Sequence, residues 1–291
     1  MFQRLLVCTT LSDGLQRLVD FVPSLAAANI QHITFLHCVP LNESGAIPRV
    51  DTEKVEEAQK LLAVEQHKIP EHVSVETRVE TGRPVDVVFR VAAEQQSDLL
   101  LMGYSLRNVL AEKLFGSTTI ELYGKTTIPI LSVRPQLIST YTTEELDLRC
   151  RHLFRHFLIP YDGTNAAKYL VEQVKQRHNI ALSVLEACHV CWIVDDCDRR
   201  DIPQAPFFEQ AKTELANVKA QLEALKLTVV TEVRAGNPVT EVIEAALEPD
   251  ISAIAVSHNP RGGFLQLSVP SFAQDLLRHS WHPILYFPFT Q

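Results

Sequence analysis

The chain has 291 residues, of which 46% are hydrophobic and 21% charged, a balance typical of globular domains. Its net charge of −8 argues against general nucleic-acid binding and against anionic membrane surfaces. No apolar segment approaches the roughly 20 residues of a membrane span, and the N-terminal apolar run is too short for a secretory signal. We therefore expect a cytoplasmic protein whose six cysteines are reduced thiols.

The first half of the chain alternates between strand-like and helix-like stretches. Short apolar runs and apolar–polar alternation predict strands, whereas apolar residues at helical spacing predict helices. Proline at the start of one such helix costs nothing, because the first N–H groups of a helix have no partner within it. In chain order we expect strand 5–9, helix 16–28, strand 33–39, helix 55–66, strand 73–79, helix 85–95, strand 99–102, helix 117–122 and strand 128–133.

The second half repeats this alternation. The expected elements are strand 157–160, helix 166–176, strand 181–190, helix 208–225, strand 228–233, helix 239–247, strand 253–256, helix 272–278 and strand 284–287. Alternating strands and helices, with continuously apolar strands, indicate parallel sheets covered on both faces. We expect an α/β fold with two tandem doubly wound domains, each containing a five-stranded parallel sheet.

Matching segments support the reading as a repeat. Glu80-Thr-Gly-Arg-Pro-Val resembles Arg234-Ala-Gly-Asn-Pro-Val, and Ile128-Pro-Ile-Leu resembles His282-Pro-Ile-Leu, in both cases 154 positions later. One shared offset near the middle and the end of each half indicates two copies of one domain. We predict domains at 1–135 and 153–291, joined by a short ordered linker, 136–152, in which Thr143 begins a helix.

One loop of the first copy has the chemistry of a phosphate site. An apolar strand leads into Gly103, and Gly116-Ser117-Thr118 opens the following helix. Glycine lets an anion approach the backbone, the free N–H groups of the first helical turn point at it, and the two hydroxyls add donors. The alternative is an ordinary strand-to-helix loop with an N-cap serine.

The loop and the repeat together resemble a tandem universal stress protein, over nearly all of the chain apart from the linker. Nucleotide-binding members of that family carry Gly-x2-Gly-x9-Gly-Ser/Thr after the fourth strand and an aspartate at the end of the first. The first copy has Gly103-x2-Leu106-x9-Gly116-Ser117 and ends its first strand with Thr10. The second copy has Asp162-Gly-Thr, but its loop reads Ser257-x2-Pro260-x9-Pro270-Ser. The resemblance implies the adenine-nucleotide alpha-hydrolase-like fold.

The same resemblance implies ATP or AMP, with or without Mg, in the first copy. The implied contacts are Thr9 and Thr10 with ribose and base, Val39 beside the adenine, Met102 and Gly103 at the floor, Leu106 in the loop, and Gly116, Ser117 and Thr118 at the phosphates. Leu106 stands where the loop favours a glycine, and Arg107 and Lys113 either offset phosphate charge or are simply solvated. Pro270 offers no N–H to a phosphate, so we expect no ATP in the second copy.

Two functions of different class remain open. The first is a stress-response regulatory protein that senses a nucleotide and signals to an unknown protein partner. In this reading the copies pair as an internal pseudo-dimer through strands 129–133 and 283–287, and a homodimer is also open. The second is a nucleotide-free scaffold with two degenerate sites. No general base is evident near the phosphates, so we assign no catalytic residue and expect at most a slow ATPase.

Other motifs carry less weight. Cys188-His-x-Cys191-x5-Cys197 suggests a metal site, but the predicted strand turns neighbouring side chains to opposite faces, so we expect no metal there. Gly-x-Ser-x-Gly, the P-loop and the Rossmann glycine motif are all absent from the sequence.

Overall fold

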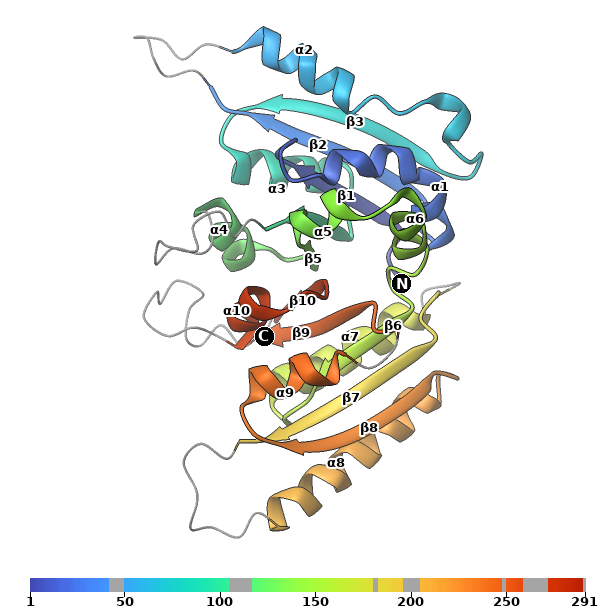
Figure 1. The fold of residues 1–291 in the computed structure, drawn as a ribbon, viewed down its shortest axis with the longest axis vertical. Coiled ribbons are helices and arrows are strands. Elements are labelled where there is room, and N and C mark those ends of the chain that lie inside the picture. The colour runs from blue at the N-terminus through green and yellow to red at the C-terminus, as the bar shows by residue number, and fades with distance from the viewer. Residues whose placement is uncertain are drawn as a thin grey trace. The chain divides into compact units, whose positions relative to one another are not determined.

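A computed structural model describes residues 1–41, 50–104, 117–179, 183–195, 205–247, 250–258 and 272–289. The chain divides into two compact units, residues 2–151 and 152–291, and each unit contains its own set of strands and helices (Figure 1).

The first unit has five parallel strands in the order β3-β2-β1-β4-β5. The order changes direction between β1 and β4, which makes the carboxyl ends of these two strands the usual ligand position in such a sheet. The elements are β1 (Arg4–Thr9), the 3-10 helix η1 (Leu15–Phe21), α1 (Val22–Ala27), β2 (His32–Val39), α2 (Thr52–Leu61), η2 (Gln66–Lys68), β3 (Ser74–Thr81), α3 (Pro84–Glu94), β4 (Leu99–Gly103), α4 (Ser117–Lys125), β5 (Ile130–Val133), α5 (Pro135–Thr140) and α6 (Thr143–Arg151).

The second unit repeats this order, as β8-β7-β6-β9-β10, again with parallel pairs. The prediction of two tandem α/β domains with parallel sheets is therefore confirmed. The elements are β6 (His156–Pro160), α7 (Asn165–Asn179), β7 (Ala187–Val194), α8 (Ala205–Glu223), β8 (Thr228–Ala235), α9 (Pro238–Ala245), β9 (Ala253–His258), α10 (Phe272–His279) and β10 (Ile284–Pro288).

Helices cover both faces of the first sheet, as the contacts of β3 show. The Thr77 hydroxyl donates to the carbonyl of Leu62, just after α2, at 3.0 Å. Its neighbour Arg78 lies 3.5 Å from Glu94 of α3. Neighbouring side chains of a strand point to opposite faces, so α2 and α3 lie on opposite sides of the sheet. Coverage on both sides explains why the run 99–102 in β4 is apolar and buried throughout.

Two predicted elements differ from the structure. The helix expected at 16–28 is split into η1 and α1, because Pro23 has no N–H to continue a single ladder and instead occupies the first turn of α1. The strand expected at 181–190 is wrong in its extent. It runs over β7, 187–194, because the Leu185 N–H turns back to the Ser183 hydroxyl at 3.2 Å while the apolar run continues to Val194.

The residues predicted as a linker form α5 and α6. A reciprocal capping pair begins α6: the Thr142 N–H donates to the Glu145 carboxylate at 2.8 Å, and the Glu145 N–H donates to the Thr142 hydroxyl at 3.3 Å. Arg17 of η1 donates to the carbonyl of Tyr141 at 3.1 Å, so this segment packs on the first unit. The pairing of the two copies through their last strands stays a prediction. No helix in the described ranges combines the length and the hydropathy that a membrane span needs.

Candidate functional site

The strand register gathers part of the predicted site at one edge of the first sheet. Cys8 pairs with Met102 across β1 and β4, so Thr9 and Gly103 both stand at the carboxyl ends of these strands. Val39 ends the neighbouring β2 and is buried, whereas Thr10 is exposed. α4 begins at Ser117, and the next residue, Thr118, is half-buried. Leu106, Gly116, Arg107 and Lys113 lie outside the described residues.

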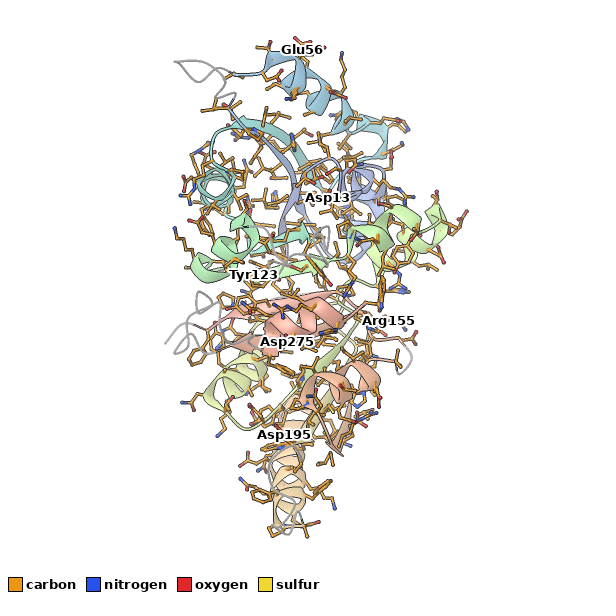
Figure 2. All side chains as sticks on the ribbon, turned by 60° about the vertical axis from the view of Figure 1, so that its left-hand side comes forward. Asp13, Glu56, Tyr123, Arg155, Asp195 and Asp275 are labelled. Atoms are coloured by element: carbon orange, nitrogen blue, oxygen red, sulfur yellow. The ribbon has the colours of Figure 1, made fainter. Side chains whose placement is uncertain are left out.

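The structure adds Asp13 to this edge, a residue that the sequence analysis missed (Figure 2). Its carboxylate, in a residue only 6% exposed, accepts three hydrogen bonds. The Thr9 hydroxyl donates to Oδ1 at 2.7 Å, the Leu15 N–H donates to the same oxygen at 3.1 Å, and the Thr10 N–H donates to Oδ2 at 2.9 Å. Donors from the end of β1 and from η1 thus hold a buried carboxylate at the switch point.

Asp13 explains why Gly103 is a glycine. A Cβ at position 103 would stand 3.1 Å from the Asp13 Cβ, 3.3 Å from its Oδ2 and 3.3 Å from Pro135 Cγ. The sequence does hold a signal for Asp13, because Asp13-Gly14 follows β1 as Asp162-Gly163 follows β6, only later in its loop. Both glycines have left-handed φ angles, 78° and 73°.

The neighbouring strand β2 contributes a histidine and a thiol, and β1 contributes a second thiol. His37 Nδ1 lies 2.9 Å from the Thr9 carbonyl oxygen, which ties β2 to the end of β1. Burial raises the pKa of the Cys8 thiol, and Cys38 and Asp13 add to the effect. Burial likewise raises the pKa of Cys38 to about 11, with Glu80 adding to it. Both thiols are therefore protonated at neutral pH and are poor nucleophiles.

Tyr104 and Arg134 follow the ends of β4 and β5. The Arg134 guanidinium lies 5.6 Å from the centre of the Tyr104 ring, and both residues are buried. Burial raises the pKa of the Tyr104 phenol, while the Arg134 charge opposes the shift. A buried cation therefore stands beside the residue that leads from Gly103 into the predicted phosphate loop.

The second copy builds its equivalent edge from aromatic side chains. Asp162 Oδ1 accepts from the Thr164 N–H at 3.0 Å and from its hydroxyl at 2.7 Å, in an exposed turn. The Trp192 ring covers the next residue, since a Cβ on Gly163 would lie 3.0 Å from it, and the centre of the Tyr161 ring is 5.7 Å from that of Trp192. Pro260 and Pro270, on which the prediction of no ATP rests, lie outside the described residues.

The cysteine and histidine group of β7 is divided between the two faces of the sheet. Cys188 is fully buried, and burial raises its pKa to about 12. The next residue, His189, points to the other face, where its Nε2 lies 3.0 Å from Glu232 Oε1. Cys197 lies outside the described residues. Within the ranges that the structure describes, no group of three histidine, cysteine, aspartate or glutamate side chains is arranged to hold a metal ion.

Comparison with protein families identifies the family to which this chain belongs. The chain matches the universal stress protein family twice, over residues 1–134 and 153–288, and it belongs to that family. It is therefore a universal stress protein with two domains in one chain. Comparison with curated proteins gives no match.

Two solved structures share this fold over nearly the whole chain. A universal stress protein from Archaeoglobus fulgidus DSM 4304 is 17% identical, with a TM-score of 0.70, and the match covers 98% of this chain and 96% of that one. A putative universal stress protein from Pseudomonas aeruginosa UCBPP-PA14 is 13% identical, with a TM-score of 0.59, covering 99% and 93%. A universal stress protein solved in complex with cAMP is 21% identical, with a TM-score of 0.33, covering 46% and 98%.

Proposed function

We propose that this chain is a stress-response binding protein that senses an adenine nucleotide, ATP or AMP with or without Mg, through its first domain. The observation that carries the proposal is Asp13 beside Gly103 at the β1–β4 switch point. An acidic side chain stands at the carboxyl end of the first strand in this domain, although the last strand residue and its successor are Thr9 and Thr10.

The hydrogen bonds of Asp13 leave room for a ligand. A carboxylate offers about four acceptor positions, two on each oxygen. Among the described residues, Oδ1 receives two donors and Oδ2 receives one, which leaves one position on Oδ2, the oxygen nearest Gly103. A ribose hydroxyl or an adenine amino group is a donor of the right kind for that position, and the exposed Thr10 supports contacts at the rim.

The phosphates would then reach the start of α4. The first N–H groups of a helix and the hydroxyls of Ser117 and Thr118 suit a phosphate there. The buried cation Arg134 adds a favourable potential at the end of β5. Among the described residues of this edge, three donors hold Asp13 in place and His37 Nδ1 lies against the Thr9 carbonyl oxygen, so neither is poised to activate water and we propose binding without appreciable hydrolysis.

The second domain takes no nucleotide in this proposal. Trp192 lies over Gly163, at the same position of its strand as His37 in the first domain, and occupies space above the end of β6. The two domains thus divide into one binding copy and one degenerate copy. The described cysteines are free thiols, which accords with a reducing compartment, and we propose a cytoplasmic location.

A calorimetric titration of nucleotide-free protein with ATP and with AMP, each with and without Mg, tests the proposal. We expect one site per chain. The Ser117→Ala/Thr118→Ala variant should bind about tenfold more weakly or worse, because it loses two phosphate donors. The Ser271→Ala variant, at the matching position of the second copy, is the control and should bind normally. A second site, or equal loss in both variants, would contradict the division between the domains.

One observation favours the alternative function, a nucleotide-free scaffold. Thr9 donates to Asp13, and its carbonyl is paired with His37, so these polar groups are satisfied within the protein. If neither ATP nor AMP gives heat or raises the melting temperature, and Leu106→Gly then creates binding, the natural chain is the nucleotide-free scaffold. ATP turnover that Ser117→Ala abolishes would instead favour the weak ATPase.

A further inference from the structure

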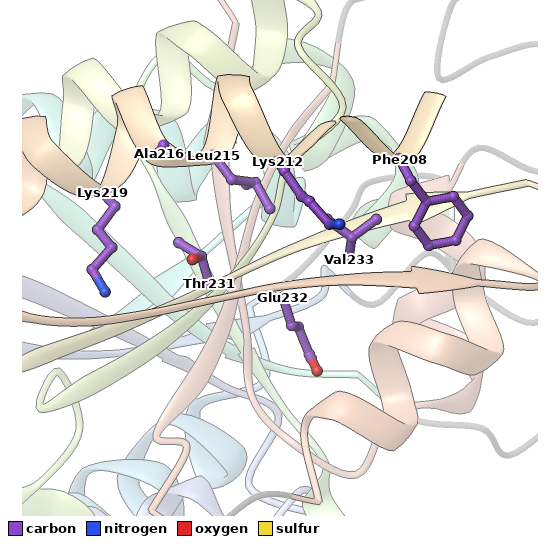
Figure 3. A pocket seen from close by; sticks show the side chains of 8 residues that line it. All are labelled: Phe208, Lys212, Leu215, Ala216, Lys219, Thr231, Glu232 and Val233. Carbon is purple, nitrogen blue, oxygen red and sulfur yellow. The ribbon is translucent and has the colours of Figure 1, made fainter. Parts of the chain in front are cut away.

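A groove runs between α8 and β8 at the edge of the second sheet. It has a volume of about 480 Å³, and Figure 3 shows Lys212, Leu215 and Lys219 reaching from α8 towards the strand. Glu232 points from β8 to the opposite side. The residues that line the groove are Phe208, Lys212, Leu215, Ala216, Lys219, Thr231, Glu232 and Val233.

The groove follows the backbone edge of β8. Three consecutive residues of the strand line it, although their side chains alternate between the two faces. The Thr228 N–H donates to the Glu186 carbonyl at 2.9 Å and the Gly236 N–H to the Val194 carbonyl at 3.1 Å, both on the β7 side. Every second residue of a parallel strand faces the same neighbour, so the N–H and C=O groups of Thr231 and Val233 face away from β7.

β8 is the last strand of its sheet among the described residues, so these outward groups have no strand to pair with. The first copy treats the same position differently. There Thr77, the counterpart of Thr231, donates its hydroxyl to the Leu62 carbonyl, just after α2 on that face of the sheet. The Thr231 hydroxyl makes no hydrogen bond within the described part of the chain. The second copy thus lacks, at Thr231, the hydrogen bond that the first copy makes on this face at Thr77.

The charges of the groove favour an acidic occupant. Lys212 and Lys219 are 61% and 42% exposed, and their ion pairs with Glu209 and Glu223 are 2.9 Å and 3.7 Å long. Exposed pairs of this kind contribute little, so both lysines are available to other carboxylates. The negative charge of Glu232 is offset on the opposite face, where the Arg234 guanidinium lies 2.9 Å away.

We propose that β8 and α8 bind an extended acidic segment of a partner protein, which pairs with the β8 edge as an additional strand. Its backbone would bond to Thr231 and Val233, and its acidic side chains on the α8 side would reach Lys212 and Lys219. Alternate apolar side chains would face the other way and cover Val230, which is 50% exposed. This surface is independent of the nucleotide site.

Fluorescence anisotropy with a short labelled peptide of alternating glutamate and valine tests the proposal. We expect saturable binding, and much weaker binding of the same peptide with lysine in place of glutamate. Lys212→Glu/Lys219→Glu should weaken binding about tenfold or more, since two charge-assisted contacts reverse sign. Lys54→Glu/Lys60→Glu on α2 makes the same charge change in the first copy and should have no effect.

Two further experiments test whether the peptide pairs with the backbone of β8. Val233→Pro removes an outward N–H from an edge strand, a position where proline is tolerated, and should abolish binding without unfolding the domain. Bound glutamate peptide should slow hydrogen exchange at the amides of Thr231 and Val233. Equal binding of both peptides, equal effects of the two lysine variants, or unprotected amides would overturn the proposal. Self-association of the chain that Val233→Pro abolishes would also overturn it, because the occupant would then be a second copy.

Discussion

Replacing Asp13 by alanine should destabilise the first domain more than any other single change at the carboxyl edge of its sheet. The substitution removes the acceptor of three hydrogen bonds and leaves the Thr9 hydroxyl and the N–H groups of Thr10 and Leu15 without a partner. The first of these bonds lies wholly in the protein interior, while Thr10 is open to solvent.

The size of the effect follows from these differences in exposure. A hydrogen bond to a charged group contributes about 1.5–3 kcal/mol, which would put three such bonds at roughly 5–9 kcal/mol. Water can solvate the Thr10 N–H in the variant, and alanine removes the desolvation cost of the buried carboxylate, so we expect a net loss of about 3–4 kcal/mol. Asp162→Ala is the matched control. Among the described residues the Asp162 carboxylate accepts hydrogen bonds from Thr164 alone, in an exposed turn, so its removal should lower the free energy of unfolding by about 1 kcal/mol.

Urea unfolding followed by far-ultraviolet circular dichroism measures both variants. Both tryptophans, Trp192 and Trp281, lie in the second unit, so their fluorescence follows that unit separately. Asp13→Ala should shift the dichroism transition far more than the fluorescence transition, and Asp162→Ala should shift neither by much. A loss under about 1 kcal/mol in Asp13→Ala would refute the reasoning, since the three bonds would then carry no net stability.

Three further changes have defined outcomes. Thr142→Ala breaks the reciprocal cap of α6 and should lower the free energy of unfolding by about 1 kcal/mol, which lowers the melting midpoint by a few degrees. An unchanged midpoint would mean that the cap is not formed in solution. Gly163→Ala places a Cβ 3.0 Å from the Trp192 ring on a backbone with a φ of 73°. It should lower the free energy of unfolding by about 1–2 kcal/mol and shift the tryptophan emission. Unaltered emission would contradict the contact with Trp192. Burial, with His189 adding to it, lowers the pKa of His156, so the unfolded chain binds that proton more readily and stability falls as pH drops through 6.5. His156→Gln should reduce the fall in the urea midpoint between about pH 7.5 and 5.5, and an identical fall in both proteins would contradict this account.

The fold could be predicted because its signals are local and repeated. The apolar runs of 99–102 and 284–287 are buried on both sides of a sheet, and that pattern is visible in the sequence. The strand predicted at 181–190 is placed too early, because an apolar run does not show at which residue the pairing with a neighbouring strand begins. The backbone starts to pair at Ala187, opposite His156, and a short turn at Ser183 precedes it.

The candidate site was harder to predict, because Asp13 reaches it through a loop rather than from a strand end. A matching motif expects the aspartate directly after β1, where this chain has Thr10. Leu11 and Gly14 both take left-handed φ angles, 62° and 78°, and this path brings the later aspartate back to the edge. This path is fixed by the close approach of Asp13 and Pro135 to Gly103 in the folded domain. The spacing of these residues along the sequence does not reveal that approach.

Photolabelling with 8-azido-ATP tests the central claim most directly. The account predicts that labelled peptides come from the first unit, from the ends of β1, β2 and β4 around Thr9, Val39 and Gly103, and that unlabelled ATP competes the label away. Label in the second unit around Trp192, or no label that ATP displaces, would contradict the claim that the first domain is the nucleotide sensor.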